Sequence, residues 1–174
     1  KLAFSIGAAC ARKLVLHDVD LALTYSSNQL AVEELVAQLR KDHDCHRPEA
    51  GYLRITIHKV NLASAEETIQ LCEDVRKAHG KPVDILVSNA GYGKRITNVW
   101  LSVELKAIDY ANTDTYLQGI PLEEFDHTIN VNLRSSFLLV KGVVEGMKNQ
   151  NWGRIIFVSS IAAYGAGING CRKD

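Results

Sequence analysis

The clearest hydrophobic pattern in the chain is a short apolar run at residues 83–87, which leads into Asn89-Ala90-Gly91. Val, Ile and Leu fill four of these five positions. Apolar and β-branched residues in so short a run favour a strand buried on both faces, as in a parallel sheet. In open α/β sheets, ligands bind at the carboxyl ends of the strands. We therefore predict that Asn89, Ala90 and Gly91 form a functional loop.

Similar strand patterns recur along the chain, with a helical pattern between successive strands. Strands are predicted where apolar residues run together or alternate with polar ones, at residues 20–25, 52–60 and 154–158. Helices are predicted where apolar or small residues share one helical face, at residues 6–16, 29–39, 65–80 and 121–150. Strands that alternate with crossover helices predict an α/β fold with a doubly wound, Rossmann-like parallel sheet.

Local signals mark where the helices begin and where one loop lies. Residues 26–28 are N-cap residues for the second helix, Ser64 and Glu67 form a capping-box pattern, and Pro121 is placed for a first helical turn. Residues 42–51 carry charges, Pro48 and Gly51, which predicts a loop. We expect His43, Cys45 and His46 to be solvated there, because no further ligand cluster accompanies them.

Composition narrows the class of protein. The 174 residues include 20 basic and 20 acidic side chains and are 47% hydrophobic, as expected for one globular domain. No basic stripe is present, which argues against a nucleic-acid partner. The four cysteines form no CxxC pair and suit reduced thiols, which predicts an intracellular, cytoplasmic protein. No apolar run is near the length of a membrane span, so we expect no signal peptide and no membrane partner.

Three motifs occur in an order that resembles a known family. Asn89-Ala90-Gly91 follows a strand, Asn130-Val131-Asn132 lies within the last long helix, and residues 153–160 read Gly-Arg-Ile-Ile-x-Val-Ser-Ser. Together they resemble the short-chain dehydrogenase/reductases, and among these the 3-oxoacyl-acyl-carrier-protein reductase type. The resemblance implies a single partial Rossmann domain over residues 1–174. It also implies a nicotinamide cofactor and hydride transfer between that cofactor and a small-molecule carbonyl or alcohol.

The resemblance implies catalytic roles for two residues. Asn132 matches the helix asparagine that holds a water for proton relay, and Ser160 matches the serine that positions the substrate carbonyl. The residues by themselves suggest plainer roles. A mid-helix asparagine is commonly solvated, and a serine at a strand end commonly satisfies backbone groups.

The family's catalytic tyrosine and lysine have no match. A helix places residues four apart on one face, so the lysine ammonium can lower the pKa of the phenol that donates the proton. None of the six tyrosines is followed by lysine at that spacing, and Lys173 stands where the tyrosine is expected. We therefore expect impaired catalysis. The alternative is a non-catalytic Rossmann fragment that binds nucleotide weakly or pairs with a full-length subunit, as a homo-oligomer, through the helix at 121–150.

The resemblance also implies where the cofactor binds. The implied cofactor-binding residues are Ile6, Gly7, Tyr25, Ser26, Ser27, Asn61, Leu62, Asn89, Ala90 and Gly91. Tyr25, Ser26 and Ser27 provide hydroxyls and no carboxylate, which favours NADP over NAD. Without the resemblance, Asn89 would be read as a residue that bridges neighbouring strands.

The resemblance further implies that the family's sheet is incomplete here. Ile6-Gly7 is all that matches the glycine-rich turn, and the first strand and the last strands are expected to be missing. Because the first strand is central, two strand edges would stay unpaired in the middle of the sheet. Residues 99–119 lie where the family usually passes directly to Pro-Leu-Glu-Glu-Phe. Two interpretations of this insertion stay open, a translated intron and an ordinary substrate-loop insertion.

Overall fold

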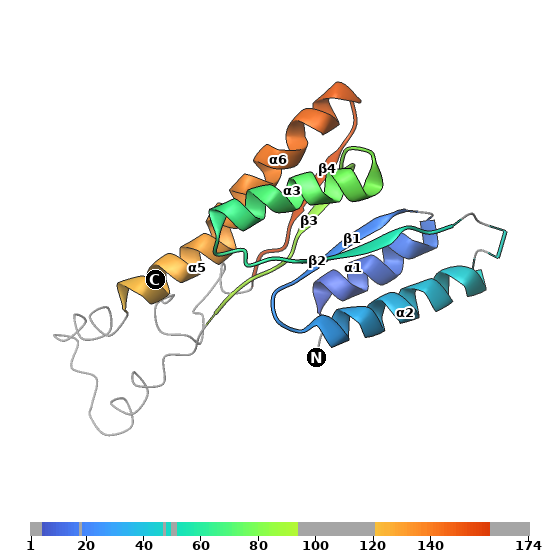
Figure 1. The fold of residues 1–174 in the computed structure, drawn as a ribbon, viewed down its shortest axis with the longest axis horizontal. Coiled ribbons are helices and arrows are strands. Elements are labelled where there is room, and N and C mark those ends of the chain that lie inside the picture. Colours follow the sequence, from blue (N-terminus) through green and yellow to red (C-terminus); the bar gives the residue numbers. More distant parts are fainter. Residues whose placement is uncertain (1–4, 18, 47, 50–51, 94–120, 161–174) are drawn as a thin grey trace, which may run out of the picture.

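The computed structural model describes residues 5–17, 19–46, 48–49, 52–93 and 121–160 (Figure 1). The described elements are, in chain order, α1 (Ile6–Leu14), η2 (Val15–His17), β1 (Leu21–Tyr25), α2 (Gln29–His46), β2 (Ile55–Lys59), α3 (Ala65–His79), β3 (Ile85–Ser88), α5 (Leu122–Ile129), η4 (Asn130–Arg134), α6 (Ser135–Asn149) and β4 (Arg154–Phe157). The predicted insertion at 99–119 lies outside the described residues, as does Lys173.

The four described strands form two separate parallel pairs. In one pair β1 lies beside β2, with Leu21 opposite Ile55, and in the other β3 lies beside β4, with Ser88 opposite Phe157. This confirms the predicted α/β fold with parallel strands and an incomplete sheet. Within the described part of the chain, β1 and β3 each have a single partner strand, so one edge of each is left without a strand.

The direction of the ladder bonds identifies the backbone groups on these open edges. The Leu21 amide donates to the Arg54 carbonyl, and the Val60 amide donates to the Tyr25 carbonyl. Because alternate residues of a parallel strand bond to the same neighbour, the backbone groups of Ala22 and Thr24 point to the opposite edge of β1. Open strand edges of this kind invite pairing with another chain.

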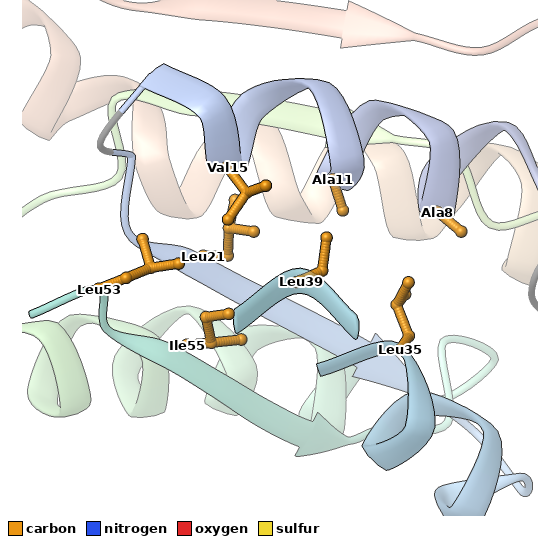
Figure 2. Close-up of a cluster of buried hydrophobic side chains, with 8 residues drawn as sticks. All are labelled: Ala8, Ala11, Val15, Leu21, Leu35, Leu39, Leu53 and Ile55. Carbon is orange, nitrogen blue, oxygen red and sulfur yellow. The ribbon is translucent and has the colours of Figure 1, made fainter. Parts of the chain in front are cut away.

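Helices α1 and α2 cover one face of the β1–β2 pair (Figure 1). Figure 2 shows the cluster that joins them, in which the small residues Ala8 and Ala11 of α1 face Leu35 and Leu39 of α2. The buried members of the cluster are Ala8, Ala11, Val15, Leu21, Leu35, Leu39, Leu53 and Ile55. Val15 and Leu39 are fully buried, which places the centre of this core between η2 and α2.

Helices α3 and α6 lie together on the other side of the molecule (Figure 1). Val60, Leu71 and Val75 are buried there and are packed against partly buried hydrophobic residues that include Leu139 of α6. The two helices approach closely at Gly142, where a Cβ atom would lie 2.5 Å from the Cys72 Sγ atom. No helix within the described ranges is long and apolar enough to span a bilayer.

The structure corrects the boundary of α2. The loop predicted from residue 42 is wrong over residues 42–46, because α2 continues to His46. His43 is only 4% exposed, so the prediction of a solvated side chain is wrong for this residue, whereas Cys45 and His46 are exposed. The cause is helical spacing: His43 lies one turn after the buried Leu39 and shares its face.

The predicted helix at 121–150 is present, but its hydrogen bonding changes within it. A π-helical segment, η4, lies between α5 and α6 and contains Asn132. Segments of this type are rare and frequently lie at functional sites. Val143 and Met147 of α6 are buried, whereas Phe137 of the same helix is 65% exposed.

Candidate functional site

The predicted site residues follow the carboxyl ends of the strands. Tyr25 ends β1, Lys59 ends β2, Ser88 ends β3 and Phe157 ends β4. Because the strands of each pair are parallel, their carboxyl ends lie at the same end of the pair. Ligands of open parallel sheets bind at such ends. We therefore expect the site at the carboxyl ends of the strands.

The start of α1 lies against the end of β3. A Cβ atom on Gly7 would be 2.8 Å from the Asn89 Nδ2 atom, closer than real Cβ contacts, so glycine lets the two segments touch. Ser5 caps the helix, because its Oγ atom accepts a hydrogen bond from the Ala8 amide at 3.1 Å. The first turn contains no acidic residue. A helix N-terminus without a carboxylate carries a partial positive charge that can hold an anion.

Asn132 holds the backbone just beyond the Asn89-Ala90-Gly91 loop. Its Oδ1 atom accepts a hydrogen bond from the Tyr92 amide at 2.7 Å, and its Nδ2 group donates to the Tyr92 carbonyl at 2.9 Å. The amide side chain thus fixes both polar groups of one loop residue. A carbonyl oxygen has two lone pairs, so Oδ1 retains capacity for a water. In this structure Asn132 is first of all the residue that positions the loop.

Tyr92 is also held through its ring, which sequence reasoning missed. The phenol donates a hydrogen bond to Glu124 Oε2 at 3.3 Å, and the ring meets His127 edge-on with centroids 4.4 Å apart. Partial burial, the hydrogen bond and the charge of Glu124 raise the pKa of Tyr92. The phenol therefore stays protonated at neutral pH. Only its position directly after the Asn-Ala-Gly motif could have drawn attention to it.

Serine residues join the end of β3 to the start of α6. The Oγ atoms of Ser88 and Ser136 are 2.8 Å apart and share a hydrogen bond. Ser135 is 2% exposed, and its hydroxyl donates to the Val131 carbonyl at 2.7 Å. Ser160 lies three residues beyond the end of β4 and is exposed. Its place beyond the carboxyl end of the strand is the one that the sequence predicted.

The end of β1 presents hydroxyl groups. Ser26 and Ser27 are exposed, and Asn28 Oδ1 accepts the Ala31 amide at 3.1 Å, which gives α2 the predicted side-chain cap. The Tyr25 phenol donates to Gln29 Oε1 at 3.0 Å. Gln29 in turn donates to the Glu33 carboxylate at 2.8 Å. A carboxylate therefore lies one helical turn beyond the hydroxyl groups, which the local sequence at residues 24–28 did not indicate.

Asn61 and Leu62, which follow β2, are held mainly by local contacts. Asn61 Oδ1 accepts the Ala63 amide at 3.0 Å, and the Asn61 amide donates to Glu67 Oε2 at 2.8 Å. Ser64 Oγ accepts the Glu67 amide at 3.1 Å, as the capping-box pattern predicted. Leu62 is partly buried against the α3 cluster. The Nδ2 group of Asn61 is the part of the side chain that could meet a ligand.

The described ranges offer little support for a metal site or for a catalytic thiol. These ranges hold no group of three or more His, Cys, Asp or Glu side chains that could bind a metal ion. Burial raises the pKa of the Cys72 thiol. A thiol with a raised pKa is a weak nucleophile at neutral pH. The close contact of Cys72 with Gly142 gives it a packing role.

Comparison with known proteins gives a consistent assignment. Residues 3–171 match the model of the short chain dehydrogenase family. The chain is 30% identical over 159 residues to dehydrogenase/reductase SDR family member 4 of Bos taurus, covering 91% of this chain and 47% of that protein. It is 27% identical over 157 residues to 3-oxoacyl-[acyl-carrier-protein] reductase of a Synechocystis strain, covering 90% and 52%.

Solved structures share the fold of this chain. A metagenomic short-chain oxidoreductase in complex with NADP has a TM-score of 0.68 at 25% identity, with coverage of 98% of this chain and 63% of that chain. NAD+-bound xylitol dehydrogenase has a TM-score of 0.69 at 24% identity, with coverage of 96% and 53%. The chain spans about half the length of the curated relatives it matches.

Proposed function

Because the chain belongs to the short-chain dehydrogenase family, we propose that its protein is an NADPH-dependent oxidoreductase that acts on small carbonyl or 3-oxoacyl compounds. One observation supports this most strongly. The start of α1, the Asn89-Ala90-Gly91 loop and Asn132 are joined through the contact of Gly7 with Asn89 and the hydrogen bonds of Asn132 to Tyr92. These segments are the ones that a dinucleotide needs at the carboxyl edge of a parallel sheet.

The residues present fit a dinucleotide in several respects. The acid-free start of α1, with Ile6 and Gly7, suits a pyrophosphate. The Asn61 Nδ2 group and Leu62 suit an adenine base, because one offers a donor and the other an apolar contact. Ala90 and Gly91 are exposed and leave backbone groups accessible. When bound, the cofactor supplies the hydride, and the protein side chains hold and orient the reacting groups.

The preference for NADP over NAD is part of the proposal. Ser26 and Ser27 are exposed residues beside the end of β1, and their hydroxyl groups can donate hydrogen bonds to a 2′-phosphate, which a carboxylate would repel. The Glu33 carboxylate accepts a hydrogen bond from the Gln29 amide group. Solved structures of this fold include an NADP complex and an NAD+ complex, so the choice must come from this chain's own residues.

Catalytic roles are assigned to two residues, and turnover is expected to be weak. Ser160 would hydrogen bond to the substrate carbonyl, and Asn132 would position the loop and a water. No tyrosine in the 174 residues is followed by lysine four positions later. Without that pair the chain has no phenol of lowered pKa to donate the proton. We therefore expect this chain to bind NADPH while reducing carbonyl substrates poorly.

A second role, pairing with another subunit of the same family, is favoured by an exposed apolar stripe along α5, η4 and α6. Its members recur at nearly every fourth position and so share one side of the helical region. They are Leu122, Phe125, Ile129, Leu133 and Phe137, with exposed fractions of 68%, 55%, 39%, 63% and 65%. Exposed apolar patches of this kind mark protein interfaces. A second copy of the chain would cover the stripe.

The pairing role can be tested by the molecular mass in solution. We expect light scattering to give a dimer for the unmodified chain and a monomer for L133E/F137E. The control L30E changes a leucine that is 72% exposed on α2, away from the stripe, and should remain dimeric. A monomeric unmodified chain would exclude pairing of two copies of this chain through the stripe.

Two further proposals concern features outside the site. Residues 99–119 are either a translated intron or a substrate-loop insertion, and sequencing the transcript distinguishes the two. A message that retains the segment in most copies would exclude the intron. The cytoplasm is the proposed compartment, in keeping with the free thiols of Cys10, Cys45 and Cys72.

The main test is binding of NADPH to the purified chain, which is measured by intrinsic fluorescence and by the shift of the melting temperature. Saturable binding with a raised melting temperature supports the proposal, because a ligand that binds only the folded state stabilises it. Stronger binding of NADPH than of NADH supports the cofactor preference. Absence of saturation with both cofactors would overturn the proposed function for this chain.

A further inference from the structure

A polar cluster joins α3 to the first pair of strands, away from the candidate site. Thr56 and His58 lie on β2, and His79 is the last residue of α3. The Thr56 Oγ1 atom is 2.8 Å from His58 Nε2 and also 2.8 Å from His79 Nε2. Two imidazole rings thus share a single hydroxyl group. We call Thr56, His58 and His79 the histidine clasp.

Charged residues surround the histidine clasp and tie the end of α3 to the strands. His79 Nδ1 is 4.0 Å from Asp20 Oδ2, and Lys81 Nζ is 3.0 Å from the same oxygen. Asp20 Oδ1 accepts the Arg54 amide at 3.1 Å. The Arg54 guanidinium donates to the carbonyls of Ala78 and His79 at 3.2 and 3.0 Å. The last turn of α3 is therefore attached to the segments that begin β1 and β2.

The sharing of one hydroxyl group fixes the protons on both rings. Asp20 favours a proton on His79 Nδ1, which leaves His79 Nε2 as an acceptor for the Thr56 hydroxyl. His58 Nε2 then carries its proton and donates to the Thr56 oxygen. A hydroxyl has one proton and two acceptor sites, so this arrangement satisfies all three groups only while His79 is neutral, whereas His58 can donate from Nε2 whether or not it is charged.

Protonation disturbs this arrangement. A proton on His79 Nε2 would face the Thr56 hydroxyl proton, which must then turn away. With both rings charged, two cations would meet at one oxygen near Lys81 and Arg54. Asp20 and Asp74 are the acidic groups that act on the two rings and oppose this repulsion. Burial lowers the pKa of both His58 and His79, in spite of these carboxylates.

The position of the clasp gives it a structural consequence. No ladder hydrogen bond joins the β1–β2 pair to the β3–β4 pair within the described ranges. Helix α3 contacts β2 as well as α6, so it bridges the two halves. We propose that the histidine clasp is an acid-sensitive latch: protonation of His58 and His79 releases the end of α3 from β2 and loosens the β1–β2 half from the α3–α6 half.

The direction of the pH effect follows from linkage. A histidine whose pKa is lowered by folding stabilises the closed state fully above its unfolded value of about 6.5 and progressively less below it. At one pH unit below that value, each histidine that gains its proton only on opening raises the open population about tenfold. The two histidines of the clasp act in the same direction.

Hydrogen exchange tests the latch in the whole 174-residue chain. After correction for intrinsic rates, we expect amides of β2 and of the last turns of α3 to lose protection about tenfold or more between about pH 7 and pH 5.5. The variant H58Q/H79Q keeps side-chain amides that can hydrogen bond to Thr56 but cannot titrate there, and its protection should not depend on pH. H17Q is the control, because His17 is an exposed histidine outside the clasp.

The proposal is overturned if the unmodified chain shows no such loss, or if H58Q/H79Q shows the same loss as H17Q. A second measurement does not depend on the variant folding. NMR titration of the imidazole rings in the unmodified chain should give both His58 and His79 a pKa below about 6.5. Titration of both rings at or above that value would also overturn the latch.

Discussion

Replacing Asn132 by alanine tests the arrangement of the candidate site directly. The substitution removes the hydrogen bonds to the Tyr92 amide and carbonyl, at 2.7 and 2.9 Å. A typical intramolecular hydrogen bond contributes about 0.5–1.5 kcal/mol, so the pair should stabilise the closed loop by about 1–3 kcal/mol. Since 1.4 kcal/mol corresponds to a factor of ten, opening of the loop should become roughly 5- to 150-fold more frequent.

Hydrogen exchange of the Tyr92 backbone amide measures this opening of the loop at a single position. We expect exchange in N132A to be faster by that factor at neutral pH. N132D should also exchange faster, because one carboxylate oxygen would face the Tyr92 carbonyl oxygen. N130A is the control, since Asn130 lies in the same π-helical segment. Unchanged Tyr92 exchange in N132A, or an equal effect of N130A, would refute the positioning role of Asn132.

Three further predictions concern close contacts and charge. G7A should weaken NADPH binding about tenfold or more in a fluorescence titration, because a Cβ atom would displace Asn89, whereas G93A has open space and should bind normally; equal affinities would contradict the role of Gly7. G142A should lower the free energy of unfolding in urea by about 1–3 kcal/mol through its clash with Cys72, and C72A should restore part of that loss; no rescue would exclude the contact as the cause. Burial by itself would raise the pKa of Asp20, but the hydrogen bonds from Lys81 and the Arg54 amide outweigh it and lower this pKa from 3.8. Ionised Asp20 therefore stabilises the folded state above that pH, and the stabilisation is lost as the pH falls further. The melting temperature of D20N should depend less on pH in this acidic range than that of the unmodified chain.

Local sequence signals predicted the parts of this fold that depend on neighbouring residues. Asn28 caps α2 and Ser64 caps α3 because capping requires only a side chain within a few residues of the helix start. The strand that leads to Asn89 could be recognised because burial on both faces leaves a continuous apolar run. The separation of the described strands into two pairs agrees with the expectation of unpaired strand edges in the middle of the sheet.

Features that depend on contacts between distant segments could not be predicted. Asn132 lies in the π-helical segment and is hydrogen bonded to Tyr92, which lies 40 residues earlier in the chain. His43 was placed in a solvated loop because its neighbours are charged, although its own helical face is buried. His58 and His79 lie on different elements, and only the fold shows that they share the Thr56 hydroxyl.

Titration of the purified chain with NADPH tests the central claim most directly. The account predicts saturable binding, a raised melting temperature and weaker binding to G7A than to G93A, because the start of α1 and the Asn89 loop together hold the cofactor. At a free NADPH concentration of about one hundred times the dissociation constant, the stabilisation should reach about 2.7 kcal/mol. Binding that fails to saturate, with no change in melting temperature, would contradict the claim that this chain retains a cofactor site.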